Sequence, residues 1–192
     1  MLTCDKTYSA TLEEKKSKFI AFISPYNNFS ELLATLKEEH PKARHLVTAF
    51  RYLNELEQIV EGSSDDKEPR GTAGKPILHV LQGHNLINVA VVVVRYFGGI
   101  KLGTGGLVRA YSDAVNLAFD ECKLIKYEKQ EDFSFSCSYS DLGKAEYNLQ
   151  LLGITKVEKE FKTLEVKVSV QATVEQIDKF KTSVMSKIKV GM

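Results

Sequence analysis

The sequence predicts an α+β protein made of two domains, and three observations lead to that prediction. Residues 89–94 form an unbroken apolar, mostly β-branched run, which is typical of a buried strand. Apolar residues at helical spacing follow this run from Leu107 onward. The pattern of strands and helices begins again after the charged stretch 126–132. With 192 residues, 43% of them hydrophobic, the chain has enough apolar material for a packed core.

The first half opens with alternating elements. We expect a strand at 19–23, a helix over about 30–39, a strand at 45–52, a continuing hairpin at 55–60 and a polar loop at 61–69. Asn28 or Ser30 is suited to cap the helix, and Pro41 ends it. Asn54 supplies a turn residue for the hairpin.

A second helix, the buried strand and a third helix complete the first domain. Pro76 suits the first turn of a short helix that Gly83 ends. The run 89–94 has no polar alternation, so we expect elements to cover both faces of that strand. The helix that begins near Leu107 places apolar residues on one face. Together these elements predict a two-layer α/β domain with helices packed against a sheet.

The second half has a pattern of its own. We expect a strand at 133–137, a helix at 142–152, strands at 154–161 and 164–172, a helix capped by Thr173 and a last strand at 188–190. This β-α-β-β-α-β order is ferredoxin-like. We therefore place the first domain at residues 1–128 and a ferredoxin-like second domain at residues 129–192.

The composition argues against several classes of protein. A net charge of +1 argues against a polybasic tail. No apolar run approaches the roughly 20 residues that a membrane-spanning helix needs, and the start of the chain has no apolar signal-peptide core. The three cysteines are odd in number and widely spaced, as is typical of reduced thiols. We expect a cytoplasmic protein that does not associate with membranes.

One segment combines glycine with positive charge. Most of the twelve glycines fall between Gly71 and Gly106, and residues 69–112 contain no Asp or Glu. The stretch 103–106 immediately precedes the helix expected from Leu107, whose free N–H groups and dipole attract anions. We expect an anion or RNA phosphate to bind at Lys75, Arg95, Lys101, Gly103, Thr104, Gly105, Gly106 and Arg109.

Two alternatives to this site stay open. The glycines could serve only a tight strand-to-helix turn. Arg95 ends a buried strand, so an ion pair with a carboxylate such as Asp113 is the alternative to a surface role for Arg95.

Evidence for catalysis or cofactor binding is weak. The loop acids Asp65, Asp66 and Glu68 could act as an acid/base group or bind a metal, but acids in a Ser-rich loop are more often solvated. Neither a Walker A nor a G-x-G-x-x-G pattern is present, and His40 and His45 lack further metal ligands nearby in sequence. We expect no cofactor and no metal, and we assign no catalytic residue.

Long segments carry a family resemblance. Residues 74–78 and 88–111, together with 16–21, 40–45 and 64–74, make the chain similar to the Impact/YigZ family over essentially its whole length. Lys67 stands where that family usually has glycine. The resemblance implies a first domain like the second domain of ribosomal protein S five, and a second domain like the ferredoxin-like domains that close elongation factor G. Both folds recur in proteins that contact ribosomal RNA, and eukaryotic members of the family act in translation control.

Two hypotheses for the function follow. The favoured one is a non-catalytic, translation-associated protein that binds RNA, or a ribosomal or translation-factor surface, through the glycine-rich basic segment. The alternative is a small-molecule enzyme, hydrolase-like, with a phosphorylated or carboxylated substrate on the glycines and Asp65, Asp66 or Glu68 as its acid/base group.

Overall fold

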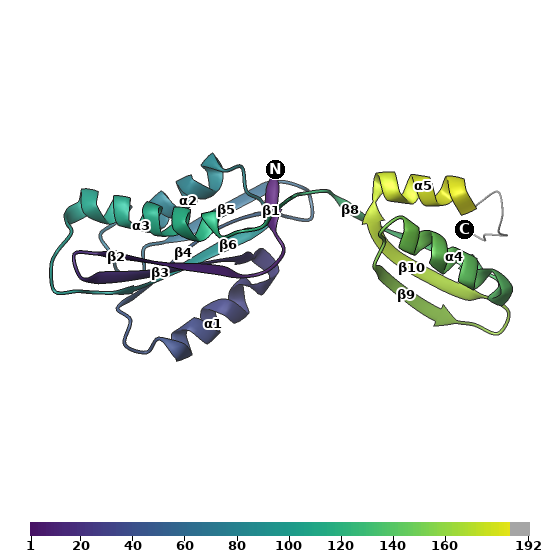
Figure 1. Cartoon of the computed structure of the whole chain (residues 1–192), viewed down its shortest axis with the longest axis horizontal. Coiled ribbons are helices and arrows are strands. Elements are labelled where there is room, and N and C mark those ends of the chain that lie inside the picture. Colours follow the sequence, from purple (N-terminus) through teal and green to yellow (C-terminus); the bar gives the residue numbers. More distant parts are fainter. Residues whose placement is uncertain (185–192) are drawn as a thin grey trace. The chain divides into compact units, whose positions relative to one another are not determined.

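The chain divides into two compact units, which Figure 1 shows in the computed structural model. The structure describes residues 1–184. The first unit is Met1–Tyr127 and the second begins at Glu128, so the division lies one residue before the boundary placed from the sequence. Among the described residues, no helix is both long and apolar enough to cross a lipid bilayer.

A five-stranded antiparallel sheet forms the centre of the first unit. Its strands, in sheet order, are β2 (Tyr8–Glu14), β3 (Ser17–Pro25), β6 (Val89–Tyr96), β4 (His45–Leu53) and β5 (Ile59–Ser64). A separate two-stranded ladder pairs β1 (Leu2–Cys4) with β7 (Leu124–Lys126).

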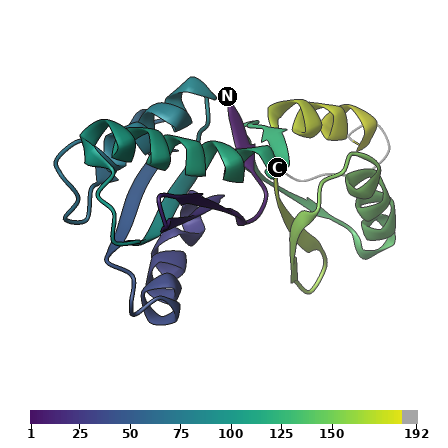
Figure 2. The ribbon, with the colours of Figure 1, turned by 60° about the vertical axis from the view of Figure 1, so that its left-hand side comes forward.

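Helices cover both faces of this sheet. The helices are α1 (Phe29–Glu39), which follows the short helix η1 (Tyr26–Asn28), α2 (Gly74–Gly83) and α3 (Gly103–Asp120). Figure 2 shows α3 and α1 on opposite sides of the sheet, with α2 on the α3 side. Accordingly Val91 and Val93 pack in the core beneath α2 and α3, whereas Val92 and Val94 pack with Leu36 of α1. All four valines are fully buried, which confirms the expectation that this strand is covered on both faces.

Several local expectations need correction. The strand β5 runs to Ser64, so the first residues of the expected polar loop belong to the sheet. Helix α1 begins at Phe29, and neither Asn28 nor Ser30 makes a capping hydrogen bond from its side chain. Asn54 does act as a turn residue, since its side-chain oxygen accepts hydrogen bonds from the N–H groups of Leu56 and Gln58.

The second unit has the expected ferredoxin-like order as far as it is described. Its elements are β8 (Gln130–Cys137), α4 (Tyr139–Leu151), β9 (Lys156–Phe161), β10 (Val166–Thr173) and α5 (Val174–Val184), with the antiparallel sheet order β8-β10-β9. Thr173 caps α5 as expected, because its hydroxyl accepts from the Gln176 N–H at 3.2 Å while the Gln176 side chain accepts from the Thr173 N–H. The strand expected at 188–190 lies outside the described residues.

Candidate nucleic-acid interface

The sheet topology of the first unit brings several connecting segments to one end. The antiparallel register places the start of β3 beside the end of β6 (Lys18 opposite Tyr96) and the start of β4 beside the same point (His45 opposite Arg95). The end of β5 follows in the same direction, with Ser64 opposite Thr48. The starts of α2 and α3 therefore lie at this end too, because each follows a strand that ends there.

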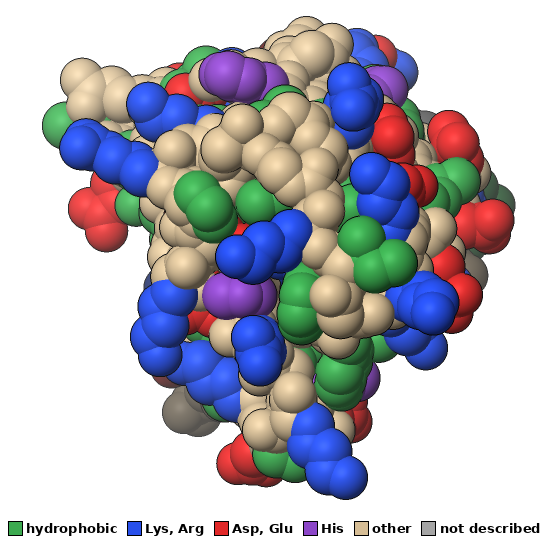
Figure 3. Space-filling model, turned by 90° about the vertical axis from the view of Figure 1, so that its left-hand side faces the viewer, with side chains coloured by type: hydrophobic (Ala, Val, Ile, Leu, Met, Phe, Trp, Pro, Cys, Tyr) green, Lys and Arg blue, Asp and Glu red, His purple; other side chains and the backbone are tan. Residues whose placement is uncertain are grey.

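Positive side chains gather at this end, which we call the basic end. Its exposed cations are Lys15, Lys16, Lys18, Lys42, Arg44, Lys67, Arg70, Lys75, Lys101 and Arg109. Figure 3 looks onto the basic end and shows Lys and Arg side chains spread over it, with acidic groups mainly toward the edge of the view. Exposed acids at the ends of β2 and α1 flank the cations, namely Glu13, Glu14, Glu38 and Glu39.

The three loop acids point into the protein instead of adding to that surface. The Asp65 carboxylate accepts hydrogen bonds from the N–H groups of Gly71 (2.7 Å), Ala73 (3.1 Å) and Gly74 (2.8 Å). Asp65 thus caps the start of α2 from the preceding loop. Partial burial raises the pKa of Asp65, but these three backbone N–H groups, with Lys75 nearby, outweigh burial and hold the pKa below its ordinary value.

Asp66 fixes the loop to the sheet. Its carboxylate accepts from the Leu46 N–H at 2.6 Å, and its backbone carbonyl lies 2.7 Å from the Nδ1 atom of His45. Asp66 and Lys67 both adopt left-handed backbone conformations, with φ of 40° and 70°. Lys67 therefore occupies a conformation that favours glycine, at the position where the Impact/YigZ pattern usually has glycine.

Glu68 is buried in a polar cluster beneath the loop. It is 8% exposed and forms an ion pair with Arg95, which is 5% exposed. The Tyr111 hydroxyl donates to the same carboxylate oxygen at 2.8 Å, and His45 Nε2 lies 3.8 Å from it. Burial, with the Glu68 charge next to it, raises the pKa of Tyr111 far above its ordinary range. The cluster joins the loop to β4, β6 and α3.

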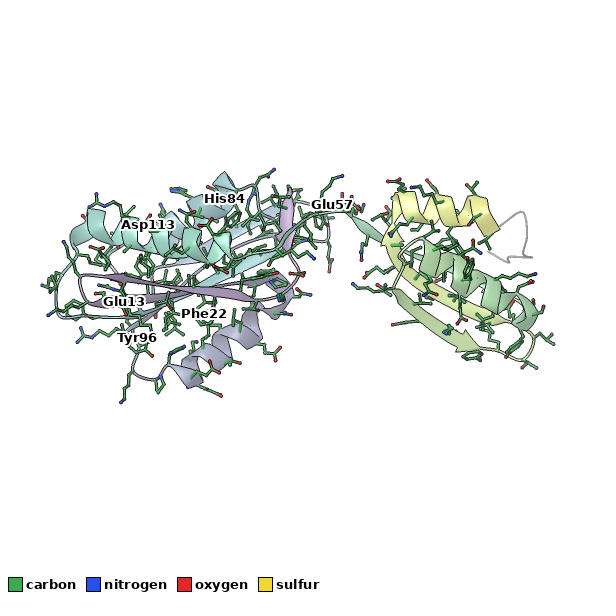
Figure 4. The ribbon with its side chains drawn as sticks, in the orientation of Figure 1. Glu13, Phe22, Glu57, His84, Tyr96 and Asp113 are labelled. Carbon is green, nitrogen blue, oxygen red and sulfur yellow. The ribbon has the colours of Figure 1, made fainter. Side chains whose placement is uncertain are left out.

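Arg95 consequently does not lie on the surface where the sequence analysis placed it. The carbon at the centre of its guanidinium lies over the rings of Phe19 and Phe97, 5.2 and 5.8 Å from their centroids, and within residues 1–184 its Nε atom has no hydrogen-bond partner. Its carboxylate partner is Glu68, whereas Asp113 is exposed on α3 (Figure 4). Arg95 therefore belongs to the interior of the basic end, where its guanidinium pairs with Glu68 and is not accessible to anions in solution.

The start of α3 differs from the expected arrangement in one respect. The helix begins at Gly103, not near Leu107, so Gly103, Thr104 and Gly105 form its first turn. First-turn N–H groups have no acceptor within a helix, and the residue before them, Leu102, contributes no side-chain cap. Gly103, Thr104 and Gly105 are all exposed, so this first turn lies at the surface of the first unit.

The cations beside this turn are free to bind. Lys75, Lys101 and Arg109 are exposed, and within the described residues none of them makes a hydrogen bond or an ion pair. Gly98 has a packing role instead, because a Cβ atom there would lie 2.0 Å from the backbone of Lys16. The structure thus brings together most of the expected anion-binding residues and removes Arg95 from the set.

No metal centre accompanies these groups in the part of the chain that is described. Residues 1–184 contain no group of three or more His, Cys, Asp or Glu side chains arranged to hold a metal ion. The oxygens of Asp65, Asp66 and Glu68 accept hydrogen bonds from the protein itself. What this end offers chemically is a set of unpaired cations around an uncapped helix start.

Comparison with known proteins identifies the family. The family model of the Impact N-terminal domain matches residues 15–119. The chain belongs to the Impact family. It is 44% identical over 136 residues to an IMPACT family member of Haemophilus influenzae, and 39% identical over 133 residues to the IMPACT family member YigZ of Escherichia coli.

The alignments with these two relatives cover only part of each protein. Each of the two alignments covers 68% of this chain and 65% of the relative, so the chain spans just under two thirds of the curated relatives that it matches. A solved structure described as a hypothetical protein is 29% identical and aligns over 98% of this chain and 95% of its own, with a TM-score of 0.67. That structure supports the fold of both units.

Proposed function

We propose that this protein is a non-catalytic, translation-associated protein that binds structured RNA through its basic end. One observation carries the proposal. The sheet topology brings exposed Lys and Arg residues from several separate segments to one end, while the loop acids Asp65, Asp66 and Glu68 at that end accept hydrogen bonds from the protein itself. A chain with a net charge of only +1 thereby presents a locally positive surface.

The groups at the basic end suit phosphate. Lys and Arg side chains neutralise backbone phosphates, and the uncapped start of α3 offers N–H donors together with the positive end of the helix dipole. Nucleic acid presents many phosphates at regular spacing, so it engages several of these cations at once. Structured RNA is favoured because the family resemblance points to folds that contact ribosomal RNA; this part of the proposal is an analogy of fold.

The non-catalytic part of the proposal rests on the loop acids. A general acid or base needs a carboxylate that reaches the substrate. Asp65 holds three backbone N–H groups, Asp66 holds one and Glu68 pairs with Arg95 and Tyr111. These contacts support a structural role for all three, and they weaken the alternative of a small-molecule enzyme.

Salt dependence of RNA binding tests the proposal. We expect Lys75, Lys101 and Arg109 together to contribute about −2 to −3 to the slope of log K against log salt, since each phosphate contact contributes roughly 0.7 to 0.9. Lys101→Ala should reduce the slope by about 1 and weaken binding to all sequences alike. Fluorescence anisotropy with a ribosomal RNA fragment, at a series of salt concentrations, measures both quantities.

A matched variant controls for total charge. Alanine at Lys123, Lys162 and Lys167, three exposed residues that do not belong to the basic end, removes the same charge as alanine at Lys75, Lys101 and Arg109. The control variant should keep nearly the wild-type slope. Equal affinity of wild type and the basic-end triple variant would refute the proposal for this surface. An absence of RNA affinity at about 50 mM salt would instead favour a protein partner.

A further inference from the structure

A groove of about 370 Å³ lies between α2 and α3. Its walls come from Lys75, Pro76, His79 and Val80 of α2 and from Val108 and Ser112 of α3. Both helices begin at the basic end, so the groove lies next to the cations and the free N–H groups described above. Its volume is near the lower end of the roughly 300–1,000 Å³ that is usual for small-ligand sites.

The spacing of the residues explains the groove. On α3, Thr104, Val108 and Ser112 are four residues apart and share one face of the helix. On α2, Lys75 and His79 are likewise four residues apart. Val108 and Ser112 line the groove together with Lys75 and His79, and Thr104 lies one turn before Val108, in the first turn of α3.

The chemistry of the groove is divided between an apolar floor and a polar rim. Pro76 is buried, while Val108 is 38% exposed although it is β-branched and apolar. The side chains of Lys75, His79 and Ser112 make no hydrogen bond or ion pair within residues 1–184. An inorganic phosphate would leave the apolar floor unused, and a purely apolar ligand would leave the rim groups without partners.

We propose that this groove receives one unpaired base of the bound RNA, with a phosphate of the same nucleotide on Lys75. The inference rests on the proposed function and specifies which feature of the RNA is recognised. A base has an apolar face for Pro76 and Val108, a ring plane for the His79 imidazole, and edge groups for the Ser112 hydroxyl. Regular duplex RNA keeps its bases paired and stacked inside the helix, so only an unpaired base in a bulge, a loop or a single-stranded overhang fits.

The test compares two RNAs that differ by one nucleotide. One is a blunt duplex and the other is the same duplex with a single bulged adenosine. Wild-type protein should bind the bulged RNA at least about fivefold more tightly, because contact with one base is worth on the order of 1–3 kcal/mol. Ser112→Leu, which narrows the groove without a change in charge, and His79→Ala should each bring that ratio close to 1.

A control variant and the salt slope separate the two proposals. Leu117→Phe alters an exposed residue farther along α3, outside the groove lining, and should keep the wild-type ratio. Equal binding of both RNAs by wild type, with the salt slope intact, would overturn the base-binding inference and leave the proposed function standing. The base-binding inference would also be overturned if both groove variants, Ser112→Leu and His79→Ala, kept the wild-type preference for the bulged RNA. Failure to bind either RNA would remove the proposed function and this inference with it.

Discussion

Two helices begin at the same end of the first unit, and their first turns are completed in opposite ways. Helix α2 starts at Gly74, where the Asp65 carboxylate satisfies the N–H groups of Gly71, Ala73 and Gly74. Helix α3 starts at Gly103 with no side-chain cap and with Lys101 and Arg109 nearby. The N–H groups at the start of α2 thus bind a carboxylate of the chain itself, whereas those at the start of α3 have no side-chain cap.

The glycines at the two helix starts are required to different degrees. A Cβ atom at Gly74 would lie 2.9 Å from the backbone of Ser64, so packing requires glycine there. Gly103, the first residue of α3, has a φ of 73°, which also favours glycine. Gly105 has neither constraint within the described residues, because its φ is not in the left-handed region and an added Cβ atom would meet no atom within 4 Å outside the adjoining backbone. The comparison teaches that a glycine-rich helix start is a candidate anion site only when no carboxylate from the chain occupies it.

Removal of the internal cap should have the largest effect. Asp65→Ala leaves three backbone N–H groups of the loop and α2 without their acceptor, and should lower the free energy of unfolding by about 2–3 kcal/mol. Urea denaturation measures this change. Asp113→Ala, at an exposed position of α3, should stay within about 0.5 kcal/mol of wild type. Similar small changes in both variants would show that the α2 cap contributes little.

The same cap should make stability depend on pH. The pKa of Asp65 is lower in the folded protein than in the unfolded chain, so its stabilising effect is present above the unfolded pKa of about 3.9 and is lost as pH falls through the folded pKa. The difference in unfolding free energy between wild type and Asp65→Asn should therefore be largest near neutral pH and should shrink below about pH 4. A difference that stays constant down to pH 2 would contradict this assignment.

A carboxylate at the start of α3 should interact with the first turn of that helix as Asp65 does with the first turn of α2. Thr104→Asp should raise the stability of the first unit by about 0.3–1 kcal/mol through the helix dipole. The same charge should weaken RNA binding about tenfold or more, because it repels phosphate at this point. Thr104→Asn is the neutral control, expected to change neither quantity by more than about 0.5 kcal/mol. If Thr104→Asn lowered the RNA affinity as much as Thr104→Asp does, the cause would be the shape of the side chain and not its charge.

The smallest effect concerns the loop that supplies the α2 cap. Lys67→Gly relieves a left-handed conformation and should stabilise the protein by about 0.5–1 kcal/mol, once the extra flexibility of glycine in the unfolded chain is subtracted. Lys101→Gly removes an equal charge at a residue without positive φ and should not stabilise. Thermal unfolding distinguishes the two variants, and stabilisation by both would exclude backbone strain as the cause.

The sequence was most informative where one segment is enough to specify the structure. The run 89–94 predicted a central buried strand because its composition alone demands cover on both faces, and Thr173 was recognised as a cap from its local context. The strand Tyr8–Glu14 was missed although Tyr8, Ala10 and Leu12 alternate with polar residues, because it is a half-exposed edge strand with few large apolar residues. Its turn to β3 consists of Lys15 and Lys16, both with positive φ and neither a usual turn residue.

The site was predictable only in part, for reasons of sequence separation. Lys101, Arg109 and the glycines lie close together in the chain, so their proximity could be seen there. The pairing of Arg95 with Glu68 spans 27 residues and depends on contacts of the loop with β4 and β6. Arg44 and the Lys15–Lys16 turn join the basic end only through the register of β3, β6 and β4. A single sequence does not reveal which strands pair, or in which register, when the strands contain no recognisable motif.

Two buried cysteines, one in each unit, can report local opening of the protein. Burial raises the pKa of the Cys4 thiol to about 12 and that of Cys122 to about 11, and it also raises the pKa of Cys137. At neutral pH these thiols are almost entirely protonated and react slowly with alkylating reagents. Cys4 and Cys122 lie in the first unit and Cys137 in the second. Cys4 and Cys137 are buried, whereas Cys122 is partly exposed. The alkylation rates of Cys4 and Cys137 therefore report the transient unfolding of the first and the second unit separately.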